Sequence, residues 1–222
     1  MNHFSIFTPC FNKREIVLEA IQSVVSQTYT DFTYFIAENS NDVVTRQIVR
    51  DYVEDLHDNR IVLIEEYPNR FIPAYYSSVY MNKYLEFMKG IVVWLSDDDL
   101  LKPNCLERLN QEFTDDKDVV YWSLDTDYLV DNMWITKHTR HANRIVPIGE
   151  NVDCMLDGGQ IAHRVKCIDM LSKPYWREIW DNDTAHCDGI FFNRLIQHFP
   201  FYPIDEVLST KRTFNKSVFT QK

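Results

Sequence analysis

Residues 91–99 read IVVWLSDDD, an apolar run followed by a serine and three aspartates. Parallel strands that are covered on both faces carry such continuous apolar runs, so residues 91–95 are predicted to form a buried central strand. The carboxylates at 97–99 then stand just beyond the carboxyl end of that strand, where open α/β sheets bind their ligands. This stretch therefore indicates both a fold class and the position of a site.

Strand-like and helix-like segments alternate on the way to this stretch. Short β-rich segments cover residues 4–8, 32–37 and 60–65, with Pro9 expected to end the first, and apolar residues at helical spacing cover 15–27, 43–56 and 75–89. The alternation predicts an α/β protein with a Rossmann-like mixed sheet and helices on both faces. The loops 9–13, 38–42 and 96–100 follow three of the strands and should converge on one crevice.

The pattern changes after Pro103. Helices are predicted at 105–113, 165–171 and 188–198 and strands at 119–124 and 126–130, and residues 133–138 continue the mixed pattern. Because no linker or internal repeat separates the two parts, we expect residues 1–105 and 106–222 to form one continuous domain.

Composition narrows the function classes. The 222 residues carry a formal net charge of −10, which argues against a nucleic-acid partner and against charge-driven binding to anionic membranes. No apolar run approaches the ~20 residues that a membrane span needs, and residues 1–15 lack the pattern of a signal peptide. The five cysteines are scattered without a C-x-x-C pair, as expected of reduced thiols, so a cytoplasmic location is predicted. The sequence leaves the oligomeric state open.

The three adjacent aspartates are the sharpest chemical signal. Carboxylates held close together are stable when they are protonated, well solvated or bound to a divalent cation. Mg²⁺ or Mn²⁺ on one or two carboxylates, with diphosphate oxygens at its other positions, is a common arrangement around nucleotides. A solvated acidic turn is an equally open interpretation, because aspartate favours turns and helix N-caps.

Several motifs resemble, in order and spacing, those of the inverting GT-A glycosyltransferases of family 2. They are residues 9–13 (PCFNK), 21–29 (IQSVVSQTY) followed by Asp31-Phe32, and 96–99 (SDDD) followed by Pro103. Within that family the likeness is to bacterial spore-coat polysaccharide glycosyltransferases. It continues through Asp157, His163-Arg164, Asp188 and residues 201–206 (FYPIDE), and so covers the chain in order.

The resemblance implies transfer of a sugar, with inversion, from a nucleoside diphosphate donor of UDP or dTDP type to a glycan or other hydroxyl acceptor. It also implies Mn²⁺ or Mg²⁺ as cofactor and a role in polysaccharide or glycoconjugate synthesis. Residues 1–105 would bind the nucleotide sugar and residues 106–222 the acceptor.

The resemblance also implies roles for single residues. Asp98 would be the main metal ligand, with Asp97 at the ribose and metal edge and Asp99 in support. Pro9, Phe11 and Lys13 would lie along the nucleotide, with Lys13 near its base or phosphates. Two positions depart from the family pattern: Ser96 replaces an acidic residue, and Ala37 stands where relatives carry an aspartate near uracil. Glu38 is the expected substitute for that aspartate.

Two aspartates of the second half are candidates for the catalytic base. An inverting displacement needs a base that takes the proton of the acceptor hydroxyl, and Asp188 matches the acidic residue of the family at a predicted helix start. The alternative is an aspartate that merely stabilises a helix N-terminus. Asp157, before Gly158-Gly159, is the second candidate or a simple turn residue.

Other polar and aromatic side chains have a functional and a structural interpretation each. His163 and Arg164 would either contact phosphates or cap a helix, and His186 would either tune Asp188 or be structural. Arg70, in a proline-flanked loop, is either a diphosphate contact or a surface arginine. Trp122, Tyr175, Trp176 and Trp180 would either stack on a sugar or pack in the core.

Two other functions fit part of the pattern. A nucleotide-sugar-binding protein without catalysis would bind nucleotide without turnover. A nucleotidyltransferase also uses paired aspartates on an αβ sheet, but the chain has only five glycines and none lies near Pro9, where a phosphate loop would be expected.

Overall fold

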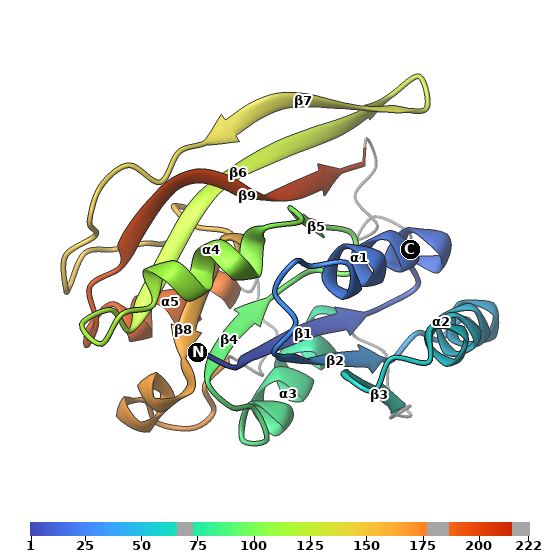
Figure 1. Ribbon diagram of the computed structural model, residues 1–222, viewed down its shortest axis with the longest axis horizontal. Coiled ribbons are helices and arrows are strands. Elements are labelled where there is room, and N and C mark those ends of the chain that lie inside the picture. The colour runs from blue at the N-terminus through green and yellow to red at the C-terminus, as the bar shows by residue number, and fades with distance from the viewer. Residues whose placement is uncertain (66–72, 177–186, 215–222) are drawn as a thin grey trace.

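The computed structural model describes residues 1–65, 73–176 and 187–214, and its strands form one sheet (Figure 1). The strand order is β3-β2-β1-β4-β8-β6-β9-β5, and β7 pairs with β6 outside this path. Strands from the first and second parts of the chain therefore meet in the middle of one sheet, where β4 pairs with β8 in antiparallel fashion.

The first part of the chain confirms the predicted alternation. Its elements are β1 (Phe4–Cys10), α1 (Arg14–Val25), β2 (Phe32–Glu38), α2 (Val43–Leu56), β3 (Ile61–Glu65), α3 (Pro73–Leu85) and β4 (Ile91–Trp94). The pairs β1–β2, β1–β4 and β2–β3 are all parallel, as crossover helices require. The apolar stretch that was predicted as a central strand lies between β1 and β8 and is buried along its whole length.

The expectation that Pro9 ends the first strand is wrong. Strand β1 continues to Cys10, and Pro9 is in register with Ala37 of β2. The pairing of β1 with β4, in contrast, ends at Phe7 opposite Trp94. Beyond Phe7 the strand has a partner on one side only, which is where a sheet tolerates the missing N–H of proline.

The second part was predicted less well. Its elements are β5 (Leu100–Leu101), α4 (Cys105–Glu112), β6 (Val119–Val130), β7 (Met133–Arg140), the 3₁₀ turn η1 (Gly158–Gln160), β8 (Ile161–Arg164), the 3₁₀ helix η2 (Val165–Met170), α5 (Cys187–Leu195) and β9 (Tyr202–Thr213). The two strands expected at 119–124 and 126–130 are one strand with a bulge against β7. The helix expected at 165–171 is a 3₁₀ helix, and strands β8 and β9 were not predicted.

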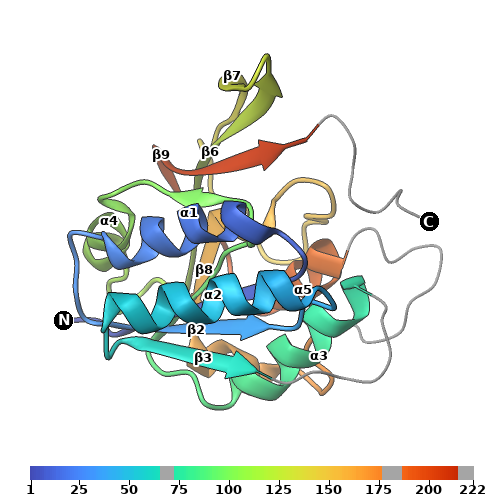
Figure 2. The ribbon, with the colours of Figure 1, turned by 90° about the vertical axis from the view of Figure 1, so that its right-hand side faces the viewer.

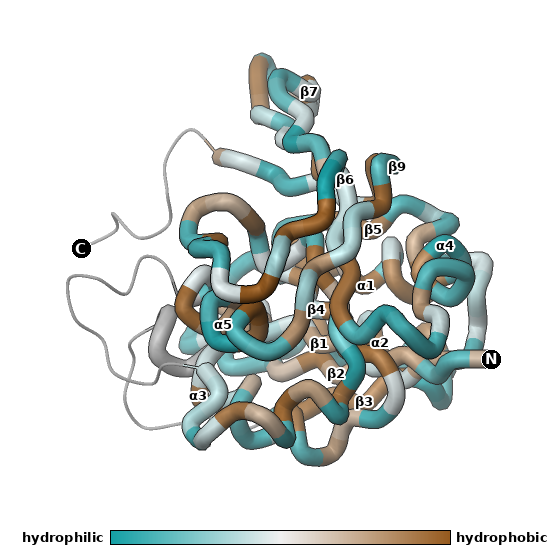
Figure 3. The backbone as a smooth tube through the Cα atoms, turned by 90° about the vertical axis from the view of Figure 1, so that its left-hand side faces the viewer, coloured by the Kyte–Doolittle hydropathy of each residue, from teal (hydrophilic) through white to brown (hydrophobic). Residues whose placement is uncertain are grey.

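Helices cover both faces of the sheet, as the sequence predicted, and each face has its own core. Side chains of a strand alternate between faces. Ile91 and Val93 of β4 pack in the core under α1, α2 and α4, whereas Val92 and Trp94 pack in the core under α3 and α5. In Figure 2, α1 and α3 lie on opposite sides of this part of the sheet. Figure 3 shows brown, hydrophobic stretches running through the interior of the body.

The β6–β7 hairpin extends away from this body (Figure 2). Strand β9 runs parallel to β6 up to the pair Tyr128 and Thr213, so the end of β9 accompanies the hairpin. In the described parts of the chain, none of the helices combines the length and the apolar character needed to cross a membrane.

Candidate functional site

The loops after β1, β2 and β4 meet, as predicted from the sheet topology. The backbone N–H of Phe11 donates to Asp97 Oδ2 over 2.8 Å, and that of Asn12 donates to Ser40 Oγ over 2.8 Å. Asn12 has a φ of 55°, a left-handed conformation that asparagine tolerates better than most residues. The Pro9–Lys13 loop is thus fixed between the Glu38–Asp42 loop and the acidic turn.

Asp97 is a buried residue of the acidic turn, and its side chain faces the Pro9–Lys13 loop. It is 8% exposed, and its Oδ2 accepts the hydrogen bond from Phe11. Burial, and next the neighbouring Asp98 carboxylate, raise the pKa of the Asp97 carboxyl to about 8. A cation beside these two carboxylates would relieve the repulsion between them.

Asp98 is paired with a basic side chain of the Pro9–Lys13 loop. Lys13 Nζ lies 2.5 Å from Asp98 Oδ2, and both side chains are less than one-fifth exposed. Burial by itself lowers the pKa of Lys13, but the Asp98 and Asp97 carboxylates outweigh it, so the pKa of Lys13 is raised. The Phe214 ring centroid lies 5.4 Å from Lys13 Nζ. The Lys13 ammonium and the Asp98 carboxylate therefore form a largely buried ion pair.

Asp99 points toward the second part of the chain. It is 2% exposed, and its Oδ1 accepts a hydrogen bond of 2.9 Å from the backbone N–H of Arg212. Burial, and next the Asp98 carboxylate, raise the pKa of Asp99. The three consecutive carboxylates therefore have three different partners. Within the described residues, no three His, Cys, Asp or Glu side chains converge as a metal cage.

The donor chemistry of the turn nevertheless fits a hard divalent cation. Carboxylate oxygens are what Mg²⁺ and Mn²⁺ prefer, and Mg²⁺ is usually bound by only one or two of them together with phosphates and water. The Lys13 ammonium at Asp98 is a built-in positive charge at the same place. A complete protein cage is therefore not required for the predicted ion.

Glu38, predicted near the nucleotide base, is buried at the end of β2 with 1% exposure. Its Oε1 accepts a hydrogen bond of 2.6 Å from the Ser40 N–H, whereas its Oε2 is buried without a hydrogen-bond partner among the described residues. Burial raises the pKa of Glu38. A buried carboxyl oxygen without a partner is costly, and a ligand that supplies a donor would remove that cost. Arg70, predicted beside the diphosphate, lies outside the described residues.

The two candidate bases lie on either side of one glycine turn. Asp157 caps η1 and accepts from the Gly159 N–H over 3.3 Å, and Asp188, in the first turn of α5, accepts from the Gly158 N–H over 3.1 Å. A Cβ on Gly158 would lie 2.9 Å from Asp188 Oδ2, and one on Gly159 would lie 3.5 Å from Asp99 Oδ2. The turn therefore brings Asp157 and Asp188 close to the acidic turn after β4.

Strand β9 adds two basic residues that the sequence did not indicate. Lys211 forms an ion pair with Asp157, and the Asp157, Asp99 and Asp188 carboxylates raise its pKa although burial by itself lowers it. Arg212 donates to the backbone carbonyl of Asp98. The contact between Arg212 and Asp99 spans 113 positions of sequence, so local periodicity could not reveal it. The sequence signal for these contacts is limited to the adjacent basic residues Lys211 and Arg212. The first half of their segment does not have the pattern of a strand.

His163 and Arg164 do not belong to this site, which corrects the suggestion that they contact phosphates. His163 is fully buried in β8, where its Nε2 accepts from Trp94 Nε1 over 3.2 Å and its Nδ1 donates to the Arg164 carbonyl over 3.0 Å. Arg164 donates to the carbonyls of Phe113 and Thr114. Both residues are structural. His186 and Trp180 lie outside the described residues, and Trp122 and Trp176 are core residues with 1% exposure or less.

The buried His163 predicts a pH-dependent stability. Burial lowers its pKa from 6.5 to about 4, so the folded state holds it neutral while the unfolded chain binds a proton below pH 6.5. This contribution is complete above pH 6.5 and is lost as the pH falls toward 4. Between pH 7.5 and 5 it amounts to about 2 kcal/mol. Urea unfolding of the wild type and of His163→Gln at both pH values should show the larger acid loss in the wild type. Equal losses would contradict this assignment.

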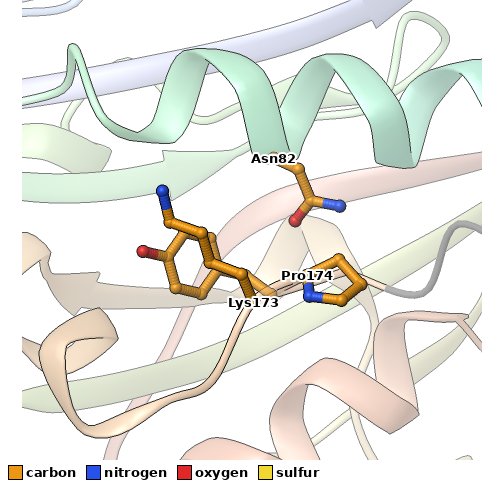
Figure 4. Close-up of a pocket in the computed structure, with 4 residues that line it drawn as sticks. Asn82, Lys173 and Pro174 are labelled. Carbon is orange, nitrogen blue, oxygen red and sulfur yellow. The ribbon is translucent and has the colours of Figure 1, made fainter.

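A pocket lies beside α3, away from the acidic turn (Figure 4). It has a volume of about 250 Å³ and is lined by Asn82 of α3 and by Lys173, Pro174 and Tyr175. Asn82 forms two hydrogen bonds with the backbone of Trp176, of 2.8 and 2.7 Å, which join α3 to this segment. Tyr175, which the sequence suggested either for sugar stacking or for the core, is thus 8% exposed and lines this pocket.

Comparisons with known proteins place this geometry in a family. Residues 5–219 match the Glycosyl transferase family 2 domain. Protein CgeD of Bacillus subtilis (strain 168) is 29% identical over 220 residues, which cover 93% of this chain and 49% of CgeD. The chain therefore spans about half the length of that relative.

Solved structures share the fold at low sequence identity. S. aureus TarS superposes with a TM-score of 0.70 at 16% identity, over 95% of this chain and 37% of TarS. The TarS fragment 1–349 in complex with UDP-GlcNAc gives 0.65 at 15%, over 99% and 61%. Mannosyltransferase PcManGT from Pyrobaculum calidifontis, in complex with GDP-Man and Mn²⁺, gives 0.65 at 13%, over 95% and 56%.

These likenesses define the class of the protein as an α/β protein with the GT-A fold, which confirms the predicted fold. With the family match extending over nearly its whole length, the chain belongs to glycosyl transferase family 2.

Proposed function

We propose that the chain is a metal-dependent inverting glycosyltransferase that moves a sugar from a nucleoside diphosphate to a hydroxyl acceptor in polysaccharide or glycoconjugate synthesis. One observation carries this proposal. The acidic turn 97–99 lies beside the Pro9–Lys13 loop through the pair Asp98–Lys13, and beside Asp157 and Asp188 through the Gly158-Gly159 turn. The residues proposed to bind the sugar donor and the two candidate bases therefore lie around the same turn.

The acidic turn would hold the cofactor. Asp98 is the proposed metal ligand, with Asp97 and Asp99 contributing charge or a second ligand, because their carboxyl groups flank it in a buried turn. A bound Mn²⁺ or Mg²⁺ supplies positive charge to the diphosphate as it leaves. The complex of PcManGT with Mn²⁺ and GDP-Man supports this assignment by analogy of fold.

The first two loops would bind the nucleotide. Glu38 Oε2 has no hydrogen-bond partner in the described part of the chain, and the imide N–H of uracil or thymine is a donor of the required kind. Phe11 and Pro9 are proposed along the base and ribose, and Lys13 and Arg70 beside the phosphates. The complexes of TarS with UDP and with UDP-GlcNAc support a UDP-type donor.

Asp188 would act as the base. In an inverting displacement, the carboxylate takes the proton of the acceptor hydroxyl while the new bond forms on the face opposite the leaving diphosphate. Asp188 is half-buried at the start of α5, and the Gly158 N–H holds its Oδ2. Asp157 is already committed to an ion pair with Lys211 and to the cap of η1, which makes it the better candidate for orienting the acceptor.

A ligand screen tests donor binding. Unfolding of the full chain is followed by thermal shift with UDP, dTDP, GDP and UDP-GlcNAc, each with and without Mn²⁺. A ligand at about 30 times its Kd stabilises the folded state by about 2 kcal/mol, and we expect this for UDP or dTDP only when Mn²⁺ is present. No stabilisation by any nucleotide would contradict the proposal.

Product analysis separates the proposed function from its two alternatives. A glycosyltransferase releases a nucleoside diphosphate from the sugar nucleotide. The release is slow when the sugar is transferred to water and faster when it is transferred to an acceptor. A nucleotidyltransferase would instead release pyrophosphate from a nucleoside triphosphate. A binding protein without catalysis would show the thermal shift but release neither product.

A further inference from the structure

Arg212 is a buried charged residue near the end of β9. Its side chain is 1% exposed, in a strand that leaves the body of the protein beside the β6–β7 hairpin. A guanidinium removed from water is costly unless hydrogen bonds and a counter-ion compensate it. Its partners therefore indicate what the fold gains by burying it.

The partners of Arg212 lie on both sides of the acidic turn. Its Nε donates to the backbone carbonyl of Asp98, and its own backbone N–H donates to Asp99 Oδ1 over 2.9 Å. The side chain and the main chain of one residue thus hold two consecutive aspartates. These two contacts fix the backbone directly after the Asp98 Cα, while Lys13 holds the Asp98 carboxylate.

The rest of the guanidinium is anchored in helix α1. Nη2 donates to the Ile16 carbonyl over 3.2 Å, and Nη1 lies 2.6 Å from Glu19 Oε2. The Trp134 ring of β7 lies 5.3 Å from the guanidinium carbon. Helix α1 follows directly after Lys13, which pairs with Asp98. Arg212 therefore connects the turn, the helix behind the Pro9–Lys13 loop and the hairpin.

We propose that Arg212 is a positioning residue, which holds the Asp98–Asp99 turn in the geometry that binds the divalent cation and the donor diphosphate. The inference rests on the proposed function, since it concerns the same turn. Glu19 is its counter-ion. Residues that orient metal ligands without touching the metal commonly change metal affinity by about 10- to 100-fold when they are replaced.

A purely structural role is the competing explanation, and the chain provides a matched control for it. Arg164 is also largely buried, donates to the carbonyls of Phe113, Thr114 and Lys117, and pairs with Asp118 over 3.4 Å. Arg164 lies outside the candidate site. Replacing either arginine by lysine keeps the charge but removes the forked set of donors.

The test measures the Kd of UDP by calorimetry with and without Mn²⁺, below the unfolding temperature of every variant. The measured quantity is the Kd without Mn²⁺ divided by the Kd with Mn²⁺. This ratio reports the metal-dependent part of binding alone. We expect Arg212→Lys to reduce this ratio at least about tenfold, with metal-free binding nearly unchanged. Glu19→Gln should reduce it less, and Arg164→Lys should leave it at the wild-type value although its thermal stability falls.

The outcomes separate the two proposals. A wild-type protein whose UDP affinity does not respond to Mn²⁺ would overturn the proposed metal-dependent function, and this inference with it. The positioning role alone would be overturned if the wild type responds to Mn²⁺ and Arg212→Lys retains the full ratio. In that case Arg212→Lys would be destabilised just as Arg164→Lys is, without a specific effect on metal-dependent binding. If Arg212→Lys does not fold, the intermediate loss expected for Glu19→Gln decides the question, because Glu19 is 57% exposed and tolerates substitution.

Discussion

Replacement of Asp188 by asparagine is expected to lower the rate of sugar transfer by about a thousandfold while leaving donor binding intact. General bases contribute about 10² to 10⁴ to enzymatic rates, and asparagine is a neutral residue of the same shape that cannot take up the proton. The amide oxygen can still accept the hydrogen bond that the Gly158 N–H now gives to Asp188 Oδ2. The turn at Gly158-Gly159 should therefore keep its position.

The measurement is kcat for release of nucleoside diphosphate, together with the Kd of UDP in the presence of Mn²⁺. Asp157→Asn is expected to lose less in kcat and more in the apparent affinity for the acceptor, because Asp157 is held by Lys211. Asp169→Asn, at an exposed position of η2, is the control and should behave as the wild type. A larger kcat loss in Asp157→Asn than in Asp188→Asn would exchange the two assignments.

The extent to which sequence predicted this fold differs between its two parts for a physical reason. Helices α1 and α2 carry one apolar stripe each, and β4 is apolar throughout, so local periodicity indicates which face each of them buries. Strand β9, in contrast, begins YPIDE, with a proline and two acidic residues, and its pairing with β6 has register shifts at Trp122, Ser123 and Leu124. Its strand character comes from partners far away in sequence.

The same distinction applies to the site. The meeting of the Pro9–Lys13 loop with the acidic turn follows from the rule that ligands bind beyond the carboxyl ends of parallel strands. The different partners of Asp97, Asp98 and Asp99 depend instead on tertiary contacts, with Phe11, Lys13 and Arg212 respectively. The burial of His163 in the core could not be predicted either, because a histidine in a short apolar segment is compatible with a core position and with a functional site.

Replacement of Asp98 by asparagine should abolish the dependence on Mn²⁺ and should lower the rate of transfer by about three orders of magnitude. A metal ion contributes several kcal/mol to the stabilisation of a leaving diphosphate, and about 4 kcal/mol corresponds to a thousandfold change in rate. The substitution also removes the counter-ion of Lys13, whose Nζ lies 2.5 Å from Asp98 Oδ2. Lys13 then stays free to hold phosphates, so weak metal-independent binding of UDP should persist or improve slightly.

This combination of opposite effects makes the prediction specific. A general loss of folding would weaken UDP binding with and without Mn²⁺ alike, whereas loss of a metal ligand removes only the difference between the two conditions. Asp118→Asn is the matched control, since Asp118 Oδ1 lies 2.8 Å from Lys166 Nζ and Asp118 is not among the predicted site residues. An Asp98→Asn variant that still binds UDP more tightly in Mn²⁺ would place the cation elsewhere. Transfer by the wild type that continues unchanged in excess chelator would show that Lys13 and Lys211, rather than a metal, supply the positive charge for the diphosphate.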